Sequence, residues 1–304
     1  MCLVVIAIII RGCNDDTLTD EEMTELIQSE VETNESATAH DNKNVPIEDK
    51  KQLYDNDSTL LNIVSVRTEN AQILNRLSYT ASYNPNTRCP NWVAWKLTRE
   101  HTDGPYSRKH VPYRADDGTV LGIDDVLTEN IKEKFILDLE SVEPRQQLTD
   151  WSTDYNMSHG HMCPAGDNKW DKAAMNQTFL LTNICPQDRN LNNGGWRVLE
   201  EKCRYWAKQY GEIYIVTGPI FREESARHLG QIAIPDAFFK VVLCLQNKPI
   251  AIGFIYRNDS SSQSFRENFT TVDNIEEITG FDFFSQLEDS IENKIESHCN
   301  LNDW

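Results

Sequence analysis

The sequence predicts an α+β fold in which a mixed or antiparallel central sheet is flanked by helices. Its second half contains three runs of β-branched and aromatic residues that are separated by Gly, Pro and Asn, and this pattern indicates strands joined by turns. The runs are residues 212–216, 238–245 and 250–256. Residues 196–210 instead repeat apolar side chains every three or four positions, which indicates an amphipathic helix.

Further elements are predicted before and after these segments. Residues 178–182 are a short apolar run of strand type, which a loop connects to the helix at 196–210. The apolar side of that helix is expected to consist of Trp196, Leu199, Cys203, Trp206 and Ala207. Thr271 begins a segment that can cap a helix through Ile278, and residues 283–295 have the spacing of a closing amphipathic helix.

The N-terminus resembles an export signal. Residues 2–10 are all apolar, a run too short to span a bilayer but of the length of a signal-peptide core. The next residues, Ile10-Arg11-Gly12-Cys13, resemble a bacterial lipoprotein cleavage box with Cys13 as the lipidated residue. This predicts residues 1–13 as a signal segment and an exported protein, either a lipoprotein of the outer membrane or cell surface or a periplasmic protein. Arg11 is unusual in such a box, so a wrongly chosen start codon and a buried strand stay as alternatives.

Charge divides the chain into a tether and a folded part. Residues 14–60 contain 14 Asp and Glu against 3 Lys, and so polar a segment buries little apolar surface, which predicts an acidic flexible tether. Residues 61–304 have a net charge of −9 and are enough for one domain with a sizeable core. This negative charge argues against a protein that binds nucleic acid through a broad basic surface. An enzyme needs only a local basic cleft.

Residues 158–200 hold the candidate chemistry. His161 is a candidate proton acceptor, Asn183 and Asn192 are neutral oxygen ligands nine residues apart, and Glu200 follows eight residues later. Hydrolysis of a phosphodiester needs a base to activate water and a cation to neutralise charge on the phosphate and the leaving oxygen. Mg²⁺ keeps several of its waters, so one Asn carbonyl can be its main protein ligand. If one helix runs from Asn192, Glu200 lies roughly 12 Å further along its axis and is expected to act through a water.

Three blocks of sequence carry a resemblance to a known family. The family patterns are Asp-Arg-Gly-His, Thr-Asn-x-x-Pro-Gln and Leu-Asn-x-Gly-x-Trp-x-x-Leu-Glu. The corresponding blocks here are Ser158-His159-Gly160-His161, Thr182-Asn183-Ile184-Cys185-Pro186-Gln187 and Leu191-Asn192-Asn193-Gly194-Gly195-Trp196-Arg197-Val198-Leu199-Glu200. The chain thus resembles the DNA/RNA non-specific endonucleases, also called ββα-metal or His-Me finger nucleases. The resemblance implies that fold for residues 61–304, and the last two blocks match in residue and spacing.

The resemblance also implies a role for each matching residue around the metal. It makes His161 the general base and Asn192 the direct ligand of Mg²⁺, with Mn²⁺ as a possible substitute. Glu200 would contact the metal through a water. Asn183 and Gln187 would support the site.

In this family an upstream arginine binds the substrate phosphate. Arg108 is the best match, and Arg114 stays open because the spacing is loose. The clear departure from the family is Ser158-His159, which stands where the pattern has Asp-Arg. A protonated His159 could replace the missing arginine and bind substrate. This departure bears on rate and pH optimum rather than on the class of reaction.

Cysteines add a prediction about covalent structure. Six remain after Cys2 and Cys13 are set aside. In an exported protein an even number favours disulfides. A bridge between Cys163 and Cys185, each two residues after a motif residue, is expected to clamp the site.

The functional hypothesis is a Mg²⁺-dependent endonuclease that hydrolyses DNA and RNA with little sequence preference. Two alternatives are a phosphodiesterase of the same fold that acts on small nucleotides and a catalytically decayed surface protein that binds nucleic acid. At the level of single residues, His159 and His161 with Cys163 could form a structural zinc site. Each asparagine could be a helix cap, and Glu200 could simply pair with Arg204 on a solvated helix face.

Overall fold

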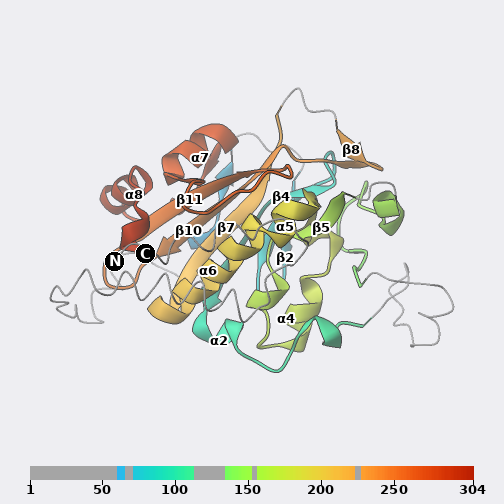
Figure 1. Ribbon diagram of the computed structural model, residues 1–304, viewed down its shortest axis with the longest axis horizontal. Helices are drawn as coiled ribbons and strands as arrows, with labels where there is room; N and C mark the ends of the chain where they lie inside the picture. Colours follow the sequence, from blue (N-terminus) through green and yellow to red (C-terminus); the bar gives the residue numbers. More distant parts are fainter. Residues whose placement is uncertain (1–59, 66–70, 113–133, 153–155, 223–226) are drawn as a thin grey trace, which may run out of the picture. The chain divides into compact units, whose positions relative to one another are not determined.

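The computed structural model describes residues 60–65, 71–112, 134–152, 156–222 and 227–304. In these residues the main element is a seven-stranded antiparallel sheet with the strand order β12-β11-β10-β7-β4-β3-β2 (Figure 1). Its strands are β2 (Gln72–Asn75), β3 (Thr80–Asn84), β4 (Cys89–Thr98), β7 (Glu212–Ile220), β10 (Ala237–Cys244), β11 (Ile250–Arg257) and β12 (Phe269–Thr270).

Smaller elements surround this sheet. The α-helices are α2 (Arg99–Thr102), α4 (Lys172–Gln177), α5 (Arg189–Asn193), α6 (Gly195–Tyr210), α7 (Val272–Thr279) and α8 (Asp289–Glu296). Three two-stranded sheets pair β1 (Val64–Ser65) with β13 (Phe281–Asp282), β5 (Met157–His161) with β6 (Ile184–Asp188), and β8 (His228–Leu229) with β9 (Ile232–Ala233). The 3₁₀ helices are η3 (Arg108–His110), η4 (Leu148–Ser152), η5 (Ala165–Asp167), η6 (Leu181–Asn183) and η7 (Leu301–Asp303).

The central strands are buried on both faces. Along β4, Val93, Trp95 and Leu97 enter the core that α6 covers, whereas Trp92 and Ala94 enter the core on the opposite face, which α7 and α8 cover (Figure 1). Successive side chains of a strand point to opposite faces. A strand that is covered on both faces therefore needs apolar residues at nearly every position, which is why these strands stand out in the sequence.

The predicted α+β class, with an antiparallel sheet flanked by helices, is confirmed. Strands β7, β10 and β11 lie at the three predicted runs, and α6 buries all five side chains expected on its apolar side. Thr271 caps α7, since its side chain accepts a hydrogen bond from the backbone N–H of Asn274 at 3.2 Å. The closing helix is shorter than predicted. It begins at Asp289 because residues 281–282 pair with β1 and Phe284 has a left-handed φ of 57°.

The strand predicted at residues 178–182 is wrong. Thr178 ends α4, residues 181–183 form η6, and β6 begins only at Ile184. Phe179 and Leu181 are each 1% exposed and belong to a separate core cluster beside the sheet. The apolar run therefore reflects burial of a turn, which periodicity alone does not distinguish from a short strand.

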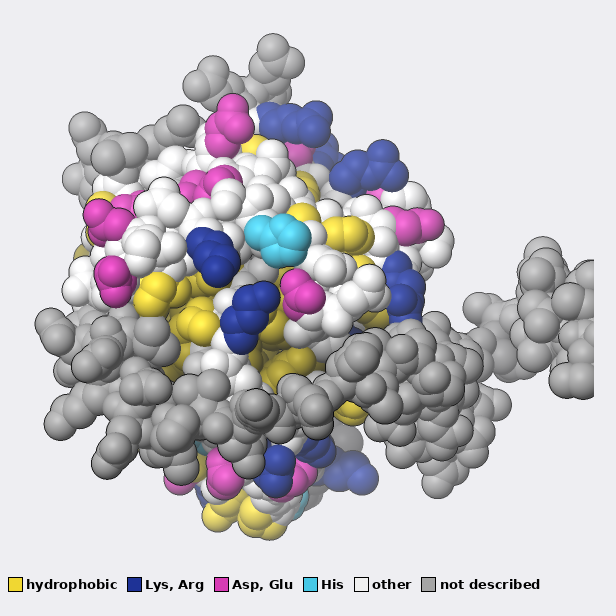
Figure 2. All heavy atoms as spheres, turned by 90° about the vertical axis from the view of Figure 1, so that its left-hand side faces the viewer, with side chains coloured by type: hydrophobic (Ala, Val, Ile, Leu, Met, Phe, Trp, Pro, Cys, Tyr) yellow, Lys and Arg dark blue, Asp and Glu magenta, His cyan; other side chains and the backbone are white. Residues whose placement is uncertain are grey.

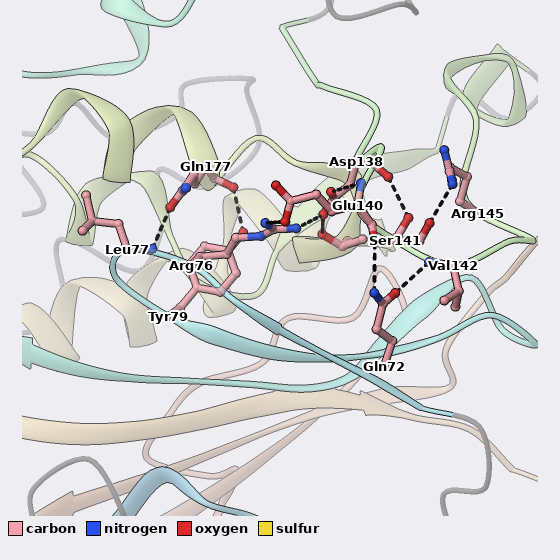
Figure 3. Close-up of polar contacts among 11 residues, drawn as sticks. Gln72, Arg76, Leu77, Tyr79, Asp138, Glu140, Ser141, Val142, Arg145 and Gln177 are labelled. Carbon is pink, nitrogen blue, oxygen red and sulfur yellow. Dashed lines mark hydrogen bonds and ion pairs between the residues drawn. The ribbon is translucent and has the colours of Figure 1, made fainter.

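The segment 134–146 is tied to the edge strand β2 by polar contacts (Figure 3). Arg76 forms ion pairs with Asp138 and Glu140, both at 2.6 Å. The side chains of Arg76 and Asp138 are almost completely buried, and Asp138 also accepts a hydrogen bond from Thr182 in η6. This network fixes segment 134–146 and the start of β6 together, and both contribute residues to the candidate site.

The predicted signal segment, the lipidated Cys13 and the acidic tether up to residue 59 lie outside the described residues. Among the residues that the structure describes, no helix is both long and apolar enough to cross a membrane.

The predicted disulfide between Cys163 and Cys185 is wrong for this structure. The six cysteines in the described part of the chain are free thiols. Cys185 lies opposite Gly160 in the β5–β6 hairpin, whereas Cys163 lies beyond the end of β5. The side chain of Cys185 hydrogen-bonds to Cys89, and Cys163 accepts a hydrogen bond from Nδ2 of Asn168 at 3.4 Å.

Candidate active site

The candidate site is built on the β5–β6 hairpin and the two helices that follow it. In the hairpin His161 lies opposite Ile184, and Ser158 lies opposite Gln187. Helix α5 begins directly after β6, with Asp188 as its N-cap accepting hydrogen bonds from two backbone N–H groups of the first turn. This strand-strand-helix unit brings together the three sequence blocks that carry the predicted chemistry.

His161 is a buried, neutral base. It is 9% exposed, and its ring packs edge-on against Phe179 with centroids 5.1 Å apart. Burial, with a further contribution from the positive charge of Arg108, lowers the pKa of His161 to about 3. The ring also hydrogen-bonds to the backbone of His159, and its Nε2 has no hydrogen-bond partner among the described residues. An uncharged imidazole with a free nitrogen can accept a proton from water.

His159 lies between two aromatic rings. Phe135 stacks on one side with centroids 3.9 Å apart and an interplanar angle of 7°, and Trp151 stacks on the other side at 3.8 Å and 16°. Burial, followed by the charge of Arg108, lowers the pKa of His159 to about 3. This contradicts the prediction of a protonated His159 that replaces an arginine. At neutral pH the side chain is therefore an uncharged ring packed between two aromatic neighbours.

Arg108 approaches the two histidines from η3. Its side chain is exposed, and its guanidinium carbon lies 5.4 Å from the centroid of the Phe179 ring. In the described part of the chain no carboxylate forms an ion pair with it. Arg108 is therefore exposed and without a carboxylate partner there, and its predicted binding of a phosphate stays a prediction. The alternative, Arg114, lies outside the described residues.

Asn192 lies in the last turn of α5 and is oriented by Ser158. Its Nδ2 donates a hydrogen bond to Oγ of Ser158 at 3.0 Å, and that hydroxyl donates to the backbone carbonyl of Gln187 at 3.1 Å. Because the hydroxyl proton is already used, Oγ accepts from the amide, and this fixes which end of the amide is nitrogen. Oδ1 of Asn192 has no donor among the described residues and can serve a metal ion. Asn192 is not the cap of α5, which is Asp188.

Asn183 has a supporting position. Its side chain is fully buried, with Nδ2 donating to the backbone carbonyls of Cys163 and Thr178, both at 2.9 Å. Its Oδ1 accepts from the backbone N–H of Cys163 at 2.9 Å. Its amide nitrogen and oxygen both hold the connection between β5 and β6 in place, so the side chain binds the backbone rather than a metal ion or a substrate.

Gln187 is packed against the backbone of β5. It is fully buried, and neither its Oε1 nor its Nε2 has a hydrogen-bond partner among the described residues. A Cβ at Gly160 would lie 2.6 Å from Cβ of Gln187. The glycine between the two histidines is therefore required by this close approach, and the buried amide keeps hydrogen-bonding capacity that the described residues leave unused.

Glu200 lies on α6 within a group of charged side chains. Burial raises its pKa to about 7, against the opposing effect of the positive charges of Lys240 and Arg204. Arg204 donates a hydrogen bond to Asp167 at 2.9 Å, and Asp167 is 2% exposed. A simple exposed pair between Glu200 and Arg204 therefore does not describe the site.

Helices α5 and α6 are separate, which changes the expected position of Glu200 relative to Asn192. Gly194 has φ of −103° and ψ of −115°, and a Cβ there would lie 2.5 Å from the backbone oxygen of Asn190. Because the axis is broken between Asn192 and Glu200, the distance of roughly 12 Å expected along one helix does not apply. The break allows the two residues to project from different helices.

A structural zinc site is not supported. Among the residues described, the donor atoms of His159, His161 and Cys163 do not converge on one point that could hold a metal ion. The thiol of Cys163 instead accepts the hydrogen bond from Asn168. Burial raises the pKa of that thiol well above its usual value, which opposes formation of the thiolate that zinc requires.

Sequence reasoning missed four residues that shape the site. They are Phe135, Trp151, Asp167 and Lys240. Lys240 had a detectable signal, since it is a lysine within an apolar strand, and it is 1% exposed with its Nζ 4.6 Å from the centroid of Trp196. Phe135 and Trp151 had no signal, because Phe135 lies in an irregular segment, Trp151 lies in the short 3₁₀ helix η4, and both reach His159 only through the tertiary fold.

Comparison with known proteins supports the family resemblance that the sequence motifs indicate. The DNA/RNA non-specific endonuclease family model matches residues 57–290. Mitochondrial nuclease EXOG of Xenopus laevis is 30% identical over 239 residues, which cover 73% of this chain and 60% of the relative. Mitochondrial endonuclease G of Homo sapiens is 29% identical over 187 residues, covering 57% and 54%. The chain thus spans little more than half the length of these relatives.

A solved structure supports the fold. A chain in the crystal structure of the EndoG/EndoGI complex superimposes with a TM-score of 0.58 at 22% identity, over 72% of this chain and 88% of that chain. Together with the strand-strand-helix unit, this likeness confirms the predicted ββα-metal fold. Because the family model matches more than half of the sequence, the chain belongs to the DNA/RNA non-specific endonuclease family.

Proposed function

We propose that this chain is a metal-dependent endonuclease that hydrolyses phosphodiester bonds of DNA and RNA with little sequence preference. Family membership supports the class of reaction. The observation that carries the proposal is a pair of free atoms on one strand-strand-helix unit, Nε2 of the neutral His161 and Oδ1 of Asn192. They match the two requirements of the reaction, a proton acceptor and an oxygen ligand for a hard cation.

His161 acts as the general base in the proposed reaction. A water attacks phosphorus while Nε2 of His161 takes one of its protons. One new P–O bond forms, the bond from phosphorus to the 3′ oxygen breaks, and the leaving oxygen takes a proton from a second water, which gives a 5′-phosphate and a 3′-hydroxyl. A positioned base of this kind contributes about 10²- to 10⁴-fold to rate. The low pKa keeps His161 in the unprotonated form over the whole physiological range.

Asn192 would hold Mg²⁺, with Mn²⁺ as an alternative. The fit rests on the hydrogen bond from Nδ2 to Ser158, which leaves Oδ1 as the free end of the amide. When bound, the ion neutralises charge on the phosphate and on the leaving oxygen. Glu200 would support the ion through a water, and Arg108 would bind the substrate phosphate with its exposed guanidinium.

Cleavage of supercoiled plasmid and of a folded RNA by the purified chain tests the proposal. We expect nicking with Mg²⁺ and none with EDTA. His161→Ala should lower the rate by about 10²-fold or more, and Asn192→Ala should raise the Mg²⁺ concentration that is needed. His298→Ala and Asn302→Ala are matched controls, because both side chains are exposed at the C-terminal end of the chain.

Two results would replace this proposal with an alternative. Turnover of small phosphodiesters without cleavage of long polymers would favour a phosphodiesterase of the same fold. Binding of nucleic acid by a folded protein that cleaves nothing with any divalent ion would favour a decayed site.

Export and lipidation of Cys13 belong to the same proposal. Sequence alone supports them, and the mass of the N-terminal peptide from a bacterial membrane fraction would test them.

A further inference from the structure

A group of acidic side chains lies between α7 and α8, on the face of the sheet opposite α6. Asp273 and Glu276 lie one turn apart on α7, and Glu296 is the last residue of α8. Each offers one carboxylate oxygen, and the three oxygens all lie within 4.8 Å of one another. Carboxylates from two helices thus converge on one point. Helices α7 and α8 themselves lie side by side in Figure 1.

The buried member of this group has an unsatisfied oxygen. Glu296 is 5% exposed, and its Oε1 has no hydrogen-bond partner among the residues described. Glu292, one turn earlier on α8, also has a buried Oε1 without a partner there. Glu276 is held in place, because its Oε1 accepts a hydrogen bond from the backbone N–H of Phe283 at 2.8 Å. A buried carboxylate oxygen without a donor is unfavourable unless a proton or a cation occupies the space beside it.

The group contains no positive charge of its own. Burial, followed by the charges of Glu276, Glu292, Asp273 and Asp282, raises the pKa of Glu296 to about 9. These four neighbouring charges are all carboxylates. The basic side chains of the same region, Lys294 and His298, instead line a hollow of about 370 Å³ near the C-terminus. Figure 2 shows this side of the molecule, where basic, histidine and acidic side chains lie beside exposed apolar ones.

We propose that Asp273, Glu276 and Glu296 form a binding site for Ca²⁺. Ca²⁺ accepts about six to eight oxygen ligands in flexible geometry and is suited to several carboxylates, whereas Mg²⁺ requires a near-ideal octahedron and is usually bound by one or two. The site joins α7 to α8, so the ion stabilises the C-terminal helices against the sheet. It is separate from the candidate active site and does not depend on the proposed nuclease activity.

Thermal unfolding of the full chain after removal of metal ions tests the proposal. At about 100 times its dissociation constant, Ca²⁺ is expected to raise Tm by roughly 5 °C. Asn192→Ala should keep the full rise, because it alters only the candidate active-site ligand. Asp273→Asn and Glu296→Gln should lose most of the rise, and calorimetric titration should show at least a tenfold weaker affinity for Ca²⁺. Glu277→Gln is the matched control, since it is an exposed acid on the same helix.

Two results would overturn the proposal. One is a wild-type Tm that does not respond to Ca²⁺. The other is a rise in Tm on addition of Ca²⁺ that Asp273→Asn and Glu296→Gln both retain. Asp273 is exposed, so its substitution decides the matter even if Glu296→Gln does not fold. Loss of the rise in Asn192→Ala alone would place the Ca²⁺ at the candidate active site and would also refute the proposal.

Discussion

Replacing Ser158 by alanine tests how Asn192 is oriented for a metal ion. The change removes the acceptor of the 3.0 Å hydrogen bond from Nδ2 of Asn192 and frees the amide to rotate. A hydrogen bond of this kind contributes about 0.5–1.5 kcal/mol, which corresponds to about a 2- to 12-fold change in an equilibrium constant. We therefore expect the Mg²⁺ concentration at half-maximal rate to rise about fivefold, with a smaller change in the maximal rate at saturating Mg²⁺.

The assay is the initial rate of plasmid nicking as a function of Mg²⁺ concentration. Ser158→Asp restores the acid of the family pattern, and its carboxylate can still accept from Nδ2 of Asn192. We expect this variant to stay within about twofold of the wild type. Ser290→Ala is the matched control, because Ser290 is exposed on α8 and its hydroxyl donates a hydrogen bond to Glu288, far from the candidate site in the fold.

An unchanged Mg²⁺ requirement in Ser158→Ala would refute this reasoning. So would an equal loss in Ser158→Asp, because that result would make the serine hydroxyl necessary for its bond to Gln187 rather than for its bond to Asn192.

Three further predictions follow from the site. Burial raises the pKa of Glu200 to about 7, so its carboxylate forms as pH rises and the rate of plasmid nicking should increase between about pH 6 and 8. Glu200→Gln should lose this increase, and a wild-type rate that does not change with pH would contradict a role of the Glu200 carboxylate in the reaction. Asn183→Ala removes three buried hydrogen bonds and should lower the free energy of unfolding, measured by urea denaturation, by roughly 3 kcal/mol. Asn302→Ala, at an exposed position, should leave the free energy of unfolding unchanged. Arg108→Ala should raise KM for DNA and should reduce the slope of log KM against log salt concentration by about one, since one phosphate contact is lost. The same effect in Lys109→Ala would show that Arg108 does not make a specific contact with the phosphate.

The sequence predicted the parts of the fold in which burial is periodic. Strands β7 and β10 are covered on both faces, so they appear as continuous apolar runs, and α6 shows its buried side at helical spacing. The site motifs were predictable for a different reason, because their chemistry requires fixed residue types at fixed spacing. Asn192 and His161 belong to one local unit, β5-β6-α5, and local units are what a sequence pattern describes best.

The parts of the fold and of the candidate site that the sequence did not predict depend on contacts between residues that are distant in the chain. Phe135 and His159 are stacked although 24 positions separate them, and no local pattern indicates such a pair. The break at Gly194 is a second case, because two adjacent glycines permit a continuous helix as well as an interrupted one. The choice between a continuous and an interrupted helix depends on tertiary contacts, since a Cβ at Gly195 would lie 2.2 Å from the backbone oxygen of Gln263.

The Ser158-His159 pair shows why a departure from a motif must be judged by its neighbours. Ser158 keeps an oxygen acceptor for Asn192 without a charge, while the stacked rings around His159 lower its pKa to about 3. The positive charge that an arginine would place here is therefore absent at neutral pH. Among the described residues Arg108 is the cation whose charge acts on both histidines. We therefore expect phosphate recognition to be concentrated on Arg108, because His159 is uncharged and both faces of its ring are covered by Phe135 and Trp151.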